Sequence, residues 1–251
     1  MIFIKSGDEL ERMRRAGRAV ARAHELLAGL IKPGVRTSQL DEAVYSFFMK
    51  EGVIPSFKGY QGFPASICTS VNEVVVHGIP GDRVLREGDI IGIDIGAMVD
   101  GFHGDAAVTY GVGEISPEAQ RLLDVTKEAL YRGIAQARVG NRVSDISHAV
   151  QTYVEGSGFS VVRDFVGHGI GTAMHEAPQI PNFGPPGRGP RLRAGMCLAI
   201  EPMVNAGTPD VNVLDDGWTV VTRDARLSAH FEHTVAVTEG EPEILTMMDV
   251  L

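Results

Sequence analysis

The strongest constraint on the fold of this chain is a weak internal repeat. The matching segments are residues 34–44 with 140–150, residues 85–94 with 192–201, and residues 105–108 with 232–235. Each match is short, but the three occur in the same order and place acidic residues on acidic residues. A single repeat of this length indicates one duplication rather than an array of repeats. We therefore expect two similar halves.

The acidic segment of the first half predicts a β-hairpin. Residues 90–109 contain two apolar runs on either side of Asp100-Gly101, a pair that suits a two-residue turn with positive φ. With that turn, Asp94 and Asp105 become diagonal neighbours on one face, roughly 7–8 Å apart at Cα. Isoleucines occupy the other face of the first strand.

Two explanations of these aspartates remain open at this point. They can be solvated residues of an edge strand, or a helix cap and a turn residue. Alternatively, they are buried beside the isoleucines, where a charge needs a partner or a metal ion.

Helical periodicity before each acidic segment completes the fold prediction. Ser6-x-x-Glu9 is a capping box in front of a periodic apolar run, and Ser116-Pro117 suits the start of a later helix. Each half is thus a helix pair followed by antiparallel strands. The predicted class is α/β (α+β), a pseudo-twofold fold with an antiparallel central sheet flanked by two helix pairs.

Length and charge limit the organisation and the partners. The 251 residues suffice for one large domain, and we expect a single domain over residues 1–251 with halves at about 1–112 and 113–251. Lys and Arg number 23 against 32 Asp and Glu, a net charge of −9. This balance argues against a general nucleic-acid or acidic-membrane partner. The arginines near the N-terminus are better explained as a solvated helix face.

Cysteine usage and the apolar runs predict a location. Cys68 and Cys197 form neither a disulfide framework nor a zinc motif. No basic-then-apolar leader is present, and no apolar run approaches the ~18–20 residues of a membrane span. We expect a reducing, cytoplasmic location, with no membrane and no specific nucleic-acid partner.

A pseudo-twofold axis would bring four carboxylates together, those of Asp94, Asp105, Glu201 and Glu232. Four such charges cannot share a buried site unless they are protonated or balanced by cations, and two divalent cations balance them. His168 lies between two glycines, which allow close approach of the backbone to a ligand. Alone it would be a flexible turn histidine, but beside four acids it is a candidate fifth ligand.

Such a ligand set predicts a particular chemistry. Four carboxylates and one imidazole suit Mn²⁺, Fe²⁺, Co²⁺ or Zn²⁺ better than a soft metal. Two of these ions about 3.5–4 Å apart can share a hydroxide and polarise a carbonyl, as in aminopeptidases. The glycines beside Asp94 are expected to leave room for the cations and for a substrate.

Six motifs then give the chain a specific resemblance. They occupy residues 70–80, 88–94, 103–105, 167–178, 199–202 and 231–234. In this combination, and over essentially the whole chain, the sequence resembles the type I methionine aminopeptidases in their short form, without an N-terminal zinc-binding extension. The resemblance implies the pita-bread fold and a single catalytic domain. It also implies hydrolysis of the initiator methionine from nascent polypeptides whose second residue is small.

The resemblance also implies a role for each polar site residue. The ligands of two divalent ions (Fe, Mn, Co or Zn) would be Asp94, Asp105, His168, Glu201 and Glu232, with Asp105 and Glu232 bridging. Glu201 would also carry a proton from the bridging water to the leaving amine. His175 would stabilise the oxyanion, and His77 would contact the scissile nitrogen. Without the resemblance, these two histidines would be a loop residue and a strand-end turn residue.

The pocket for the methionine side chain is expected to combine aromatic and sulfur groups, which suit a thioether. The implied substrate-binding residues are Phe57, Tyr60, Phe63, Cys68, His77, Met174, His175 and Trp218. Met174, Phe57 and Phe63 depart from the family pattern, in which an aromatic residue, a small residue such as cysteine, and tyrosine are frequent. We expect these departures to alter pocket shape. A structural Na⁺ or K⁺ would bind at Asn72, Val74 and Ser228.

Two other functions fit part of the pattern. A proline-directed peptidase of the same fold shares the five ligands but usually carries a large additional N-terminal domain. A non-catalytic relative that binds protein or RNA loses ligands, whereas this chain has all five. The resemblance further implies contact with the ribosome, and we expect a monomer.

Overall fold

The computed structural model describes residues 1–248, and all the extended strand pairs in that part of the chain are antiparallel. The helices are α1 (Gly7–Ala28), α2 (Thr37–Glu51), α3 (Pro117–Ile134) and α4 (Val143–Gly156), with a 3-10 helix, η1, at Tyr60–Gly62. The strands are β1 (Ile54–Pro55), β2 (Ile67–Val71), β3 (Val74–Val76), β4 (Ile90–Val99), β5 (Phe102–Gly111), β6 (Ser160–Val161), β7 (Gly167–Gly169), β8 (Glu176–Ile180), β9 (Cys197–Ile200), β10 (Met203–Asn205), β11 (Val211–Val213), β12 (Val220–Thr222), β13 (Ser228–His230), β14 (His233–Ala236) and β15 (Glu243–Ile244). Within residues 1–248, no helix is both long and apolar enough to cross a membrane.

Local sequence signals start two of the helices where they were predicted. Ser6 Oγ accepts a hydrogen bond from Glu9 N (3.3 Å) and Ser6 N donates to the Glu9 carboxylate (2.7 Å), which confirms the capping box of α1. Ser116 caps α3 through a hydrogen bond from Ala119 N, with Pro117 at the first helical position.

The β4–β5 hairpin has the predicted turn and register. Asp100 and Gly101 form the turn with φ angles of 49° and 79°. Gly96 pairs with Asp105, so Asp94 lies diagonal to that aspartate on the same face, as predicted. Since side chains alternate between the two faces of a strand, Ile91, Ile93 and Ile95 of β4 point the opposite way.

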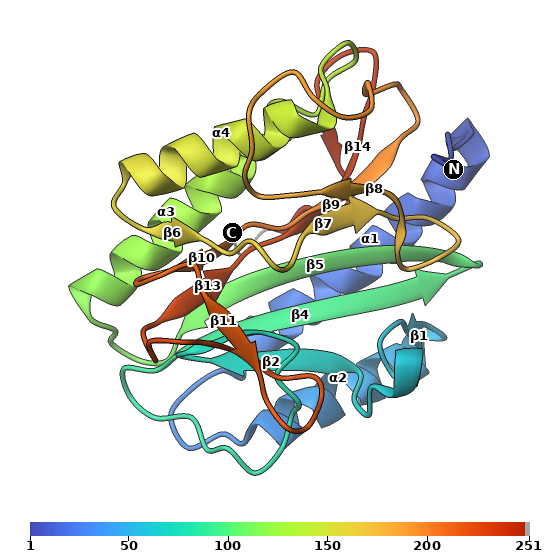
Figure 1. The fold of residues 1–251 in the computed structure, drawn as a ribbon. Helices are drawn as coiled ribbons and strands as arrows, with labels where there is room; N and C mark the ends of the chain where they lie inside the picture. Colours follow the sequence, from blue (N-terminus) through green and yellow to red (C-terminus); the bar gives the residue numbers. More distant parts are fainter. Residues whose placement is uncertain (249–251) are drawn as a thin grey trace.

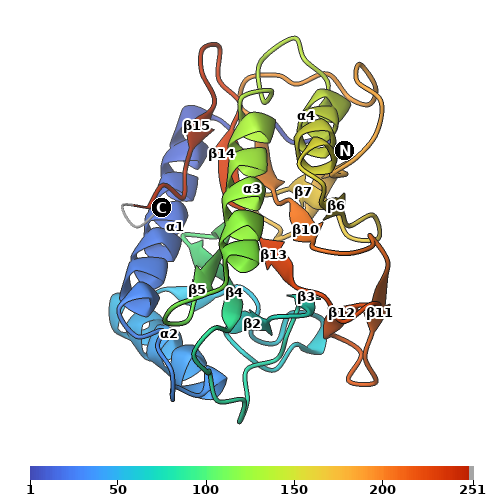
Figure 2. The same ribbon diagram turned by 90° about the vertical axis from the view of Figure 1, so that its left-hand side faces the viewer.

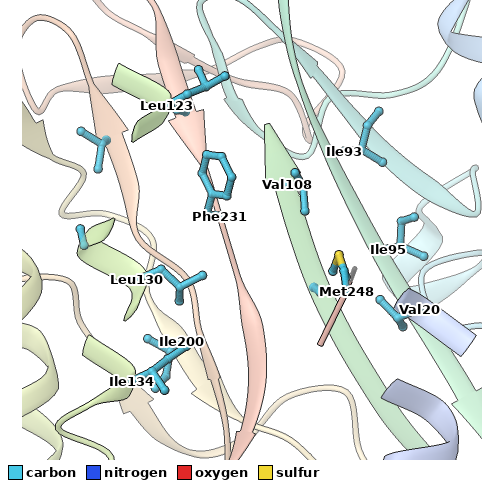
Figure 3. Close-up of a cluster of buried hydrophobic side chains, with 14 of the residues drawn as sticks. Val20, Ile93, Ile95, Val108, Leu123, Leu130, Ile134, Ile200, Phe231 and Met248 are labelled. Carbon is cyan, nitrogen blue, oxygen red and sulfur yellow. The ribbon is translucent and has the colours of Figure 1, made fainter. Parts of the chain in front are cut away.

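The face of β4 that carries Ile91, Ile93 and Ile95 packs against the helices. Figure 1 shows β4 and β5 side by side across the middle of the molecule with α1 behind them, and Figure 2 shows α1 and α3 with their axes roughly parallel. Between these layers lies a buried apolar cluster, which in Figure 3 includes Val20 of α1, Ile93 and Ile95 of β4, and Leu130 of α3. The helices thus cover one face of the strands, and the carboxylate face is turned away from them.

The two halves contain equivalent contacts, in keeping with the pseudo-twofold fold. An isolated antiparallel bridge joins Arg36 to Val84 at the start of α2, and another joins Arg142 to Arg191 at the start of α4. In each case the arginine N–H donates to a side-chain oxygen three residues later, at 2.8 and 2.7 Å. The division of the chain near residue 112 stays a prediction.

The second half departs from the first beside Glu201. Strand β4 is continuous over ten residues, whereas Pro202 separates β9 from β10 because proline has no N–H to donate to a sheet. The repeat predicts that Ile200 pairs with Val235, but it pairs with His233. The interruption therefore shifts the register of the second hairpin relative to the first.

Candidate active site

A cavity of about 300 Å³ opens on the carboxylate face of the strands. It is lined by Gln61 together with all the residues predicted to bind metal or substrate, namely Phe57, Tyr60, Phe63, Cys68, His77, Asp94, Asp105, His168, Met174, His175, Glu201, Trp218 and Glu232. The five predicted metal ligands come from separate elements. Asp94 lies on β4, Asp105 on β5 and His168 on β7, while Glu201 follows β9 and Glu232 precedes β14.

Hydrogen bonds between the two halves hold the backbone at two of the acidic residues. Glu232 N donates to Ala107 O at 2.8 Å, which holds this part of the second half against β5. The Thr234 hydroxyl donates to Asp105 O at 2.8 Å and accepts from Asp105 N at 2.9 Å. The backbones of Asp105 and Glu232 are therefore held next to each other.

His168 is oriented as a ligand would be. Its Nδ1 donates to the carbonyl of Gly169 at 2.9 Å, which places the ring proton on Nδ1 and leaves a lone pair on Nε2. That Nε2 lies 3.6 Å from Glu201 Oε1 and 4.0 Å from Asp105 Oδ2. Ligand atoms of Asp105, His168 and Glu232 all lie within 4.8 Å of one another, so these three groups can hold one metal ion.

Unsatisfied buried oxygens show that the cluster fits cations. Asp94 Oδ1, Asp105 Oδ1 and Glu232 Oε1 are buried and have no hydrogen-bond partner within the described part of the protein. Buried polar atoms of proteins are usually paired, and a cluster of unpaired carboxylate oxygens is the pattern expected of a hard-metal site. The donor set therefore fits divalent cations.

Burial and mutual repulsion raise the pKa of the carboxyls. Burial raises the pKa of Glu201 to about 8, and burial together with the Glu201 charge raises that of Asp94 to about 6. The pKa values of Asp105 and Glu232 lie well above their ordinary values because of burial and the neighbouring carboxylates. Burial, with the nearby His175, lowers the pKa of His168 to about 3. The cluster therefore strongly disfavours four bare negative charges.

The remaining wall of the cavity is apolar. Phe57, Phe63, Cys68 and Met174 are buried there in one cluster. The Phe63 ring meets Trp218 edge to face, with centroids 5.1 Å apart. These aromatic and sulfur groups make a surface that suits an unbranched thioether side chain.

The structure corrects the predicted role of one of the two glycines beside Asp94. A Cβ at Gly96 would lie 2.7 Å from the Phe57 ring and 2.9 Å from Ser56 Cβ, so this glycine admits a pocket wall and not cations. A Cβ at Gly167 or Gly169 would lie 2.4 or 2.3 Å from a backbone oxygen of a neighbouring segment. Those two glycines therefore permit close strand packing beside His168.

Sequence reasoning missed two residues of the site. Gln61 lines the cavity from η1 with an unusual φ of 48°. His230 is buried, and its Nε2 lies 3.5 Å from Glu201 Oε2. His230 is two residues before Glu232, so the alternation of an extended chain was the signal that could have placed both on one face.

The residues predicted to hold a monovalent cation lie on neighbouring segments. Asn72 has a left-handed backbone (φ 56°), and its carbonyl accepts a hydrogen bond from Ser228 N at 2.9 Å. Val74 begins β3, two residues further along the chain. Asn72 and Ser228 are thus brought together.

Comparison with known proteins agrees with the fold and with the site. Residues 11–239 match metallopeptidase family M24. Methionine aminopeptidase 1 of Bacillus subtilis is 60% identical over 246 residues, which cover 98% of this chain and 99% of that protein. The methionine aminopeptidase structure from Thermotoga maritima is 50% identical with a TM-score of 0.97, covering 98% of this chain and 99% of the other.

A more distant structure shares the fold alone. The prolidase from Pyrococcus furiosus is 21% identical with a TM-score of 0.79, and the match covers 98% of this chain and 66% of that protein. The methionine aminopeptidases match this chain at higher sequence identity and over nearly their whole length, which separates them from the prolidase as relatives. The chain belongs to metallopeptidase family M24, and within that family to the methionine aminopeptidases.

Proposed function

We propose that this cavity is the active site in which the protein hydrolyses the bond after an N-terminal methionine. The substrates would be nascent polypeptides whose second residue is small. The observation that carries the proposal is the convergence of four carboxylates and His168 beside aromatic and sulfur-containing walls. Three of the carboxylates have a buried oxygen without a hydrogen-bond partner in the described part of the protein. Family membership supports both the methionine substrate and the use of divalent metal.

The proposed metal-holding residues are Asp94, Asp105, His168, Glu201 and Glu232, and their charge suits two divalent ions of Fe, Mn, Co or Zn. Such ions supply positive charge that polarises the scissile carbonyl and acidifies a water molecule. The protein's own contribution is to keep the His168 proton on Nδ1 and to exclude competing donors from the carboxylate oxygens.

Glu201 is proposed as the group that moves the proton. Burial raises its pKa to about 8 in the metal-free protein, and a carboxyl whose pKa is raised by its surroundings can both accept a proton from water and return it to the leaving amine. The Glu201 carboxylate is also only partly buried, so that it is reachable from the cavity.

His175 and His77 are proposed to act on the two sides of the scissile amide. Tyr60 Oη lies 2.8 Å from His175 Nδ1. If the hydroxyl donates, the imidazole proton is on Nε2, where it can donate to the developing oxyanion. His77 lies edge to face against Trp218, with centroids 6.3 Å apart, and we propose that it contacts the scissile nitrogen.

A metal titration tests the proposal. Metal-free protein would be assayed with Fe²⁺, Mn²⁺, Co²⁺ or Zn²⁺ on peptides such as Met-Gly-Met and Met-Ala, and on Xaa-Pro peptides. We expect turnover of the methionine peptides only after metal is added. Cleavage of Xaa-Pro peptides in preference would favour a proline-directed peptidase instead.

Two matched substitutions complete the test. Glu201→Gln should lower kcat by at least about 10²-fold, the lower part of the range for a positioned acid–base group. Glu25→Gln makes the same chemical change on an exposed position of α1 and should leave kcat unchanged. Wild-type turnover by the Glu201 variant, with its metal content verified, would contradict the proposal.

The family's role in the cell suggests the oligomeric state, the location and the partners of this protein. We propose a monomer that works in the cytoplasm and contacts the ribosome as chains emerge. A structural Na⁺ or K⁺ is proposed at the backbone of Asn72 and Val74 and at Ser228.

A further inference from the structure

His230 is a buried histidine beside the active-site carboxylates, and its Nε2 atom has no hydrogen-bond partner among the described residues. It ends β13, is 4% exposed, and its Nε2 forms no hydrogen bond within residues 1–248. The nearest acidic atom is Glu201 Oε2 at 3.5 Å. A polar nitrogen that is removed from water and left unpaired in a native protein calls for an explanation.

The backbone of His230 is tightly fixed. Its N–H donates to the Thr109 hydroxyl at 2.9 Å, and that hydroxyl donates back to the His230 carbonyl at 2.8 Å. His230 also pairs with Met203 in the β10–β13 ladder. Since Thr109 lies on β5 of the first half, the imidazole is anchored at the seam between the halves and stays directed at Glu201.

Glu201 lies between two imidazoles that differ in what they can donate. His168 Nε2 is 3.6 Å from Glu201 Oε1, but the His168 proton is on Nδ1, so its Nε2 cannot donate to the carboxylate. His230 Nε2 has no such restriction. Among the described residues, no other side chain forms a hydrogen bond or ion pair with the Glu201 carboxylate.

We propose that His230 is a positioning residue that acts through Glu201. In its neutral Nε2–H form, it donates a hydrogen bond to Glu201 Oε2 and directs Oε1 toward His168. A shift on the order of 0.5 Å converts the present separation into an ordinary N–H···O hydrogen bond. No proton is transferred in this role. The inference rests on the proposed function of Glu201 as a metal-holding and proton-moving group.

Two substitutions at position 230 separate hydrogen bonding from packing. His230→Leu keeps much of the volume and removes the donor, whereas His230→Gln offers an amide N–H with similar reach. Mn²⁺ binding to the metal-free variants would be measured by calorimetry, and kcat and KM would be measured with Met-Gly-Met. We expect about 10–100-fold weaker Mn²⁺ binding and lower kcat for the leucine variant, the usual cost of losing a group that orients a metal ligand.

The conservative variant and an unrelated buried histidine provide the controls. His230→Gln should stay within about threefold of wild type for both Mn²⁺ binding and kcat, with KM unchanged. His24 is also fully buried, but it is hydrogen-bonded to Ala106 O and Tyr110 Oη. His24→Gln should therefore lower thermal stability without weakening Mn²⁺ binding, which shows that loss of a buried histidine is not sufficient.

A double-mutant cycle tests whether His230 acts through Glu201. If it does, His230→Leu should cost little further Mn²⁺ affinity in a Glu201→Gln background. Equal losses in both backgrounds, wild-type Mn²⁺ binding by His230→Leu, or equal impairment of the glutamine and leucine variants would each overturn the inference. Failure of the proposed function would appear separately, as wild-type turnover by the Glu201→Gln variant alone.

Discussion

Tyr60 and His175 illustrate how a single contact can join substrate binding to catalysis. The tyrosine lies in the wall predicted to hold the methionine side chain, yet its hydroxyl is 2.8 Å from His175 Nδ1 and the two rings stack with centroids 5.3 Å apart. His175 in turn lies against His168, with ring centroids 4.2 Å apart. The tyrosine hydroxyl can therefore set which His175 nitrogen carries the proton facing the substrate.

We predict that Tyr60→Phe lowers kcat by about 3–10-fold on a Met-Ala peptide, the equivalent of one hydrogen bond. The KM should change little, because the aromatic ring remains in the pocket. Steady-state kinetics on the metal-loaded protein would measure both constants.

Phe63→Leu is the matched control for this prediction, since Phe63 contacts Trp218 in the pocket wall. It should raise KM and leave kcat nearly unchanged. A tyrosine variant with wild-type kcat would show that the hydroxyl does not orient His175.

At the scale of elements, the N-terminal segment is tied to the segment that carries His175. Lys5 Nζ lies 2.5 Å from Glu176 Oε2, and both side chains are almost completely buried, at 5% and 3% exposure. Lys5 N also donates to Gly195 O at 2.8 Å. Residues that lie far apart in the sequence thus support the turn in front of β8.

We predict that Lys5→Met lowers the free energy of unfolding by about 3–5 kcal/mol, because it leaves the Glu176 carboxylate buried without its partner. Urea unfolding followed by circular dichroism would measure this loss. Lys50→Met, at an exposed position of α2, should cost less than about 0.5 kcal/mol.

A double substitution tests whether Lys5 and Glu176 stabilise the protein as a pair. Adding Glu176→Met to the Lys5 variant should recover part of the stability, because no unpaired charge is then buried. A further loss in the double variant would mean that the two side chains do not act as a pair.

Elements specified by neighbouring residues were predictable from the sequence, and those specified by distant contacts were not. The Asp100-Gly101 turn fixed the register that places Asp94 diagonal to Asp105. The five candidate ligands likewise carry recognisable local patterns. In contrast, the register change beside Pro202 and the approach of His230 to Glu201 depend on how the second half packs against β5. No local propensity encodes that packing.

For the whole molecule, the duplication has an electrostatic consequence. Each half contributes two carboxyls to the seam, and burial raises the pKa of all four. A carboxyl whose pKa is raised on folding binds its proton more tightly in the folded state. Stability is then lost as the pH rises from the unfolded value, about 4 to 4.5, through the folded value.

Buried histidines change the stability with pH in the opposite direction, over a lower pH range. Burial lowers the pKa of His24 to about 4, so its folded form prefers to be neutral. Its contribution to stability is complete above the unfolded value of about 6.5 and is lost as the pH falls toward 4. Between about pH 6.5 and 8, the carboxyls should therefore dominate the change of stability with pH, since the pKa of Glu201 in the folded protein is about 8.

We predict that the metal-free protein loses stability as the pH rises from 6.5 to 8, by up to about 1.4 kcal/mol per pH unit for each carboxyl that keeps its proton in the folded state and loses it on unfolding. Saturating Mn²⁺ should raise Tm more at pH 8 than at pH 6.5, because metal must displace these protons in order to bind. Scanning calorimetry with chelator or with Mn²⁺ would measure both slopes. In chelator, Glu201→Gln should show a shallower decline, since the amide has no proton to lose. A metal-free Tm that rises over this range, or an Mn²⁺ shift that is equal at both pH values, would mean that the four acids do not share one electrostatic site.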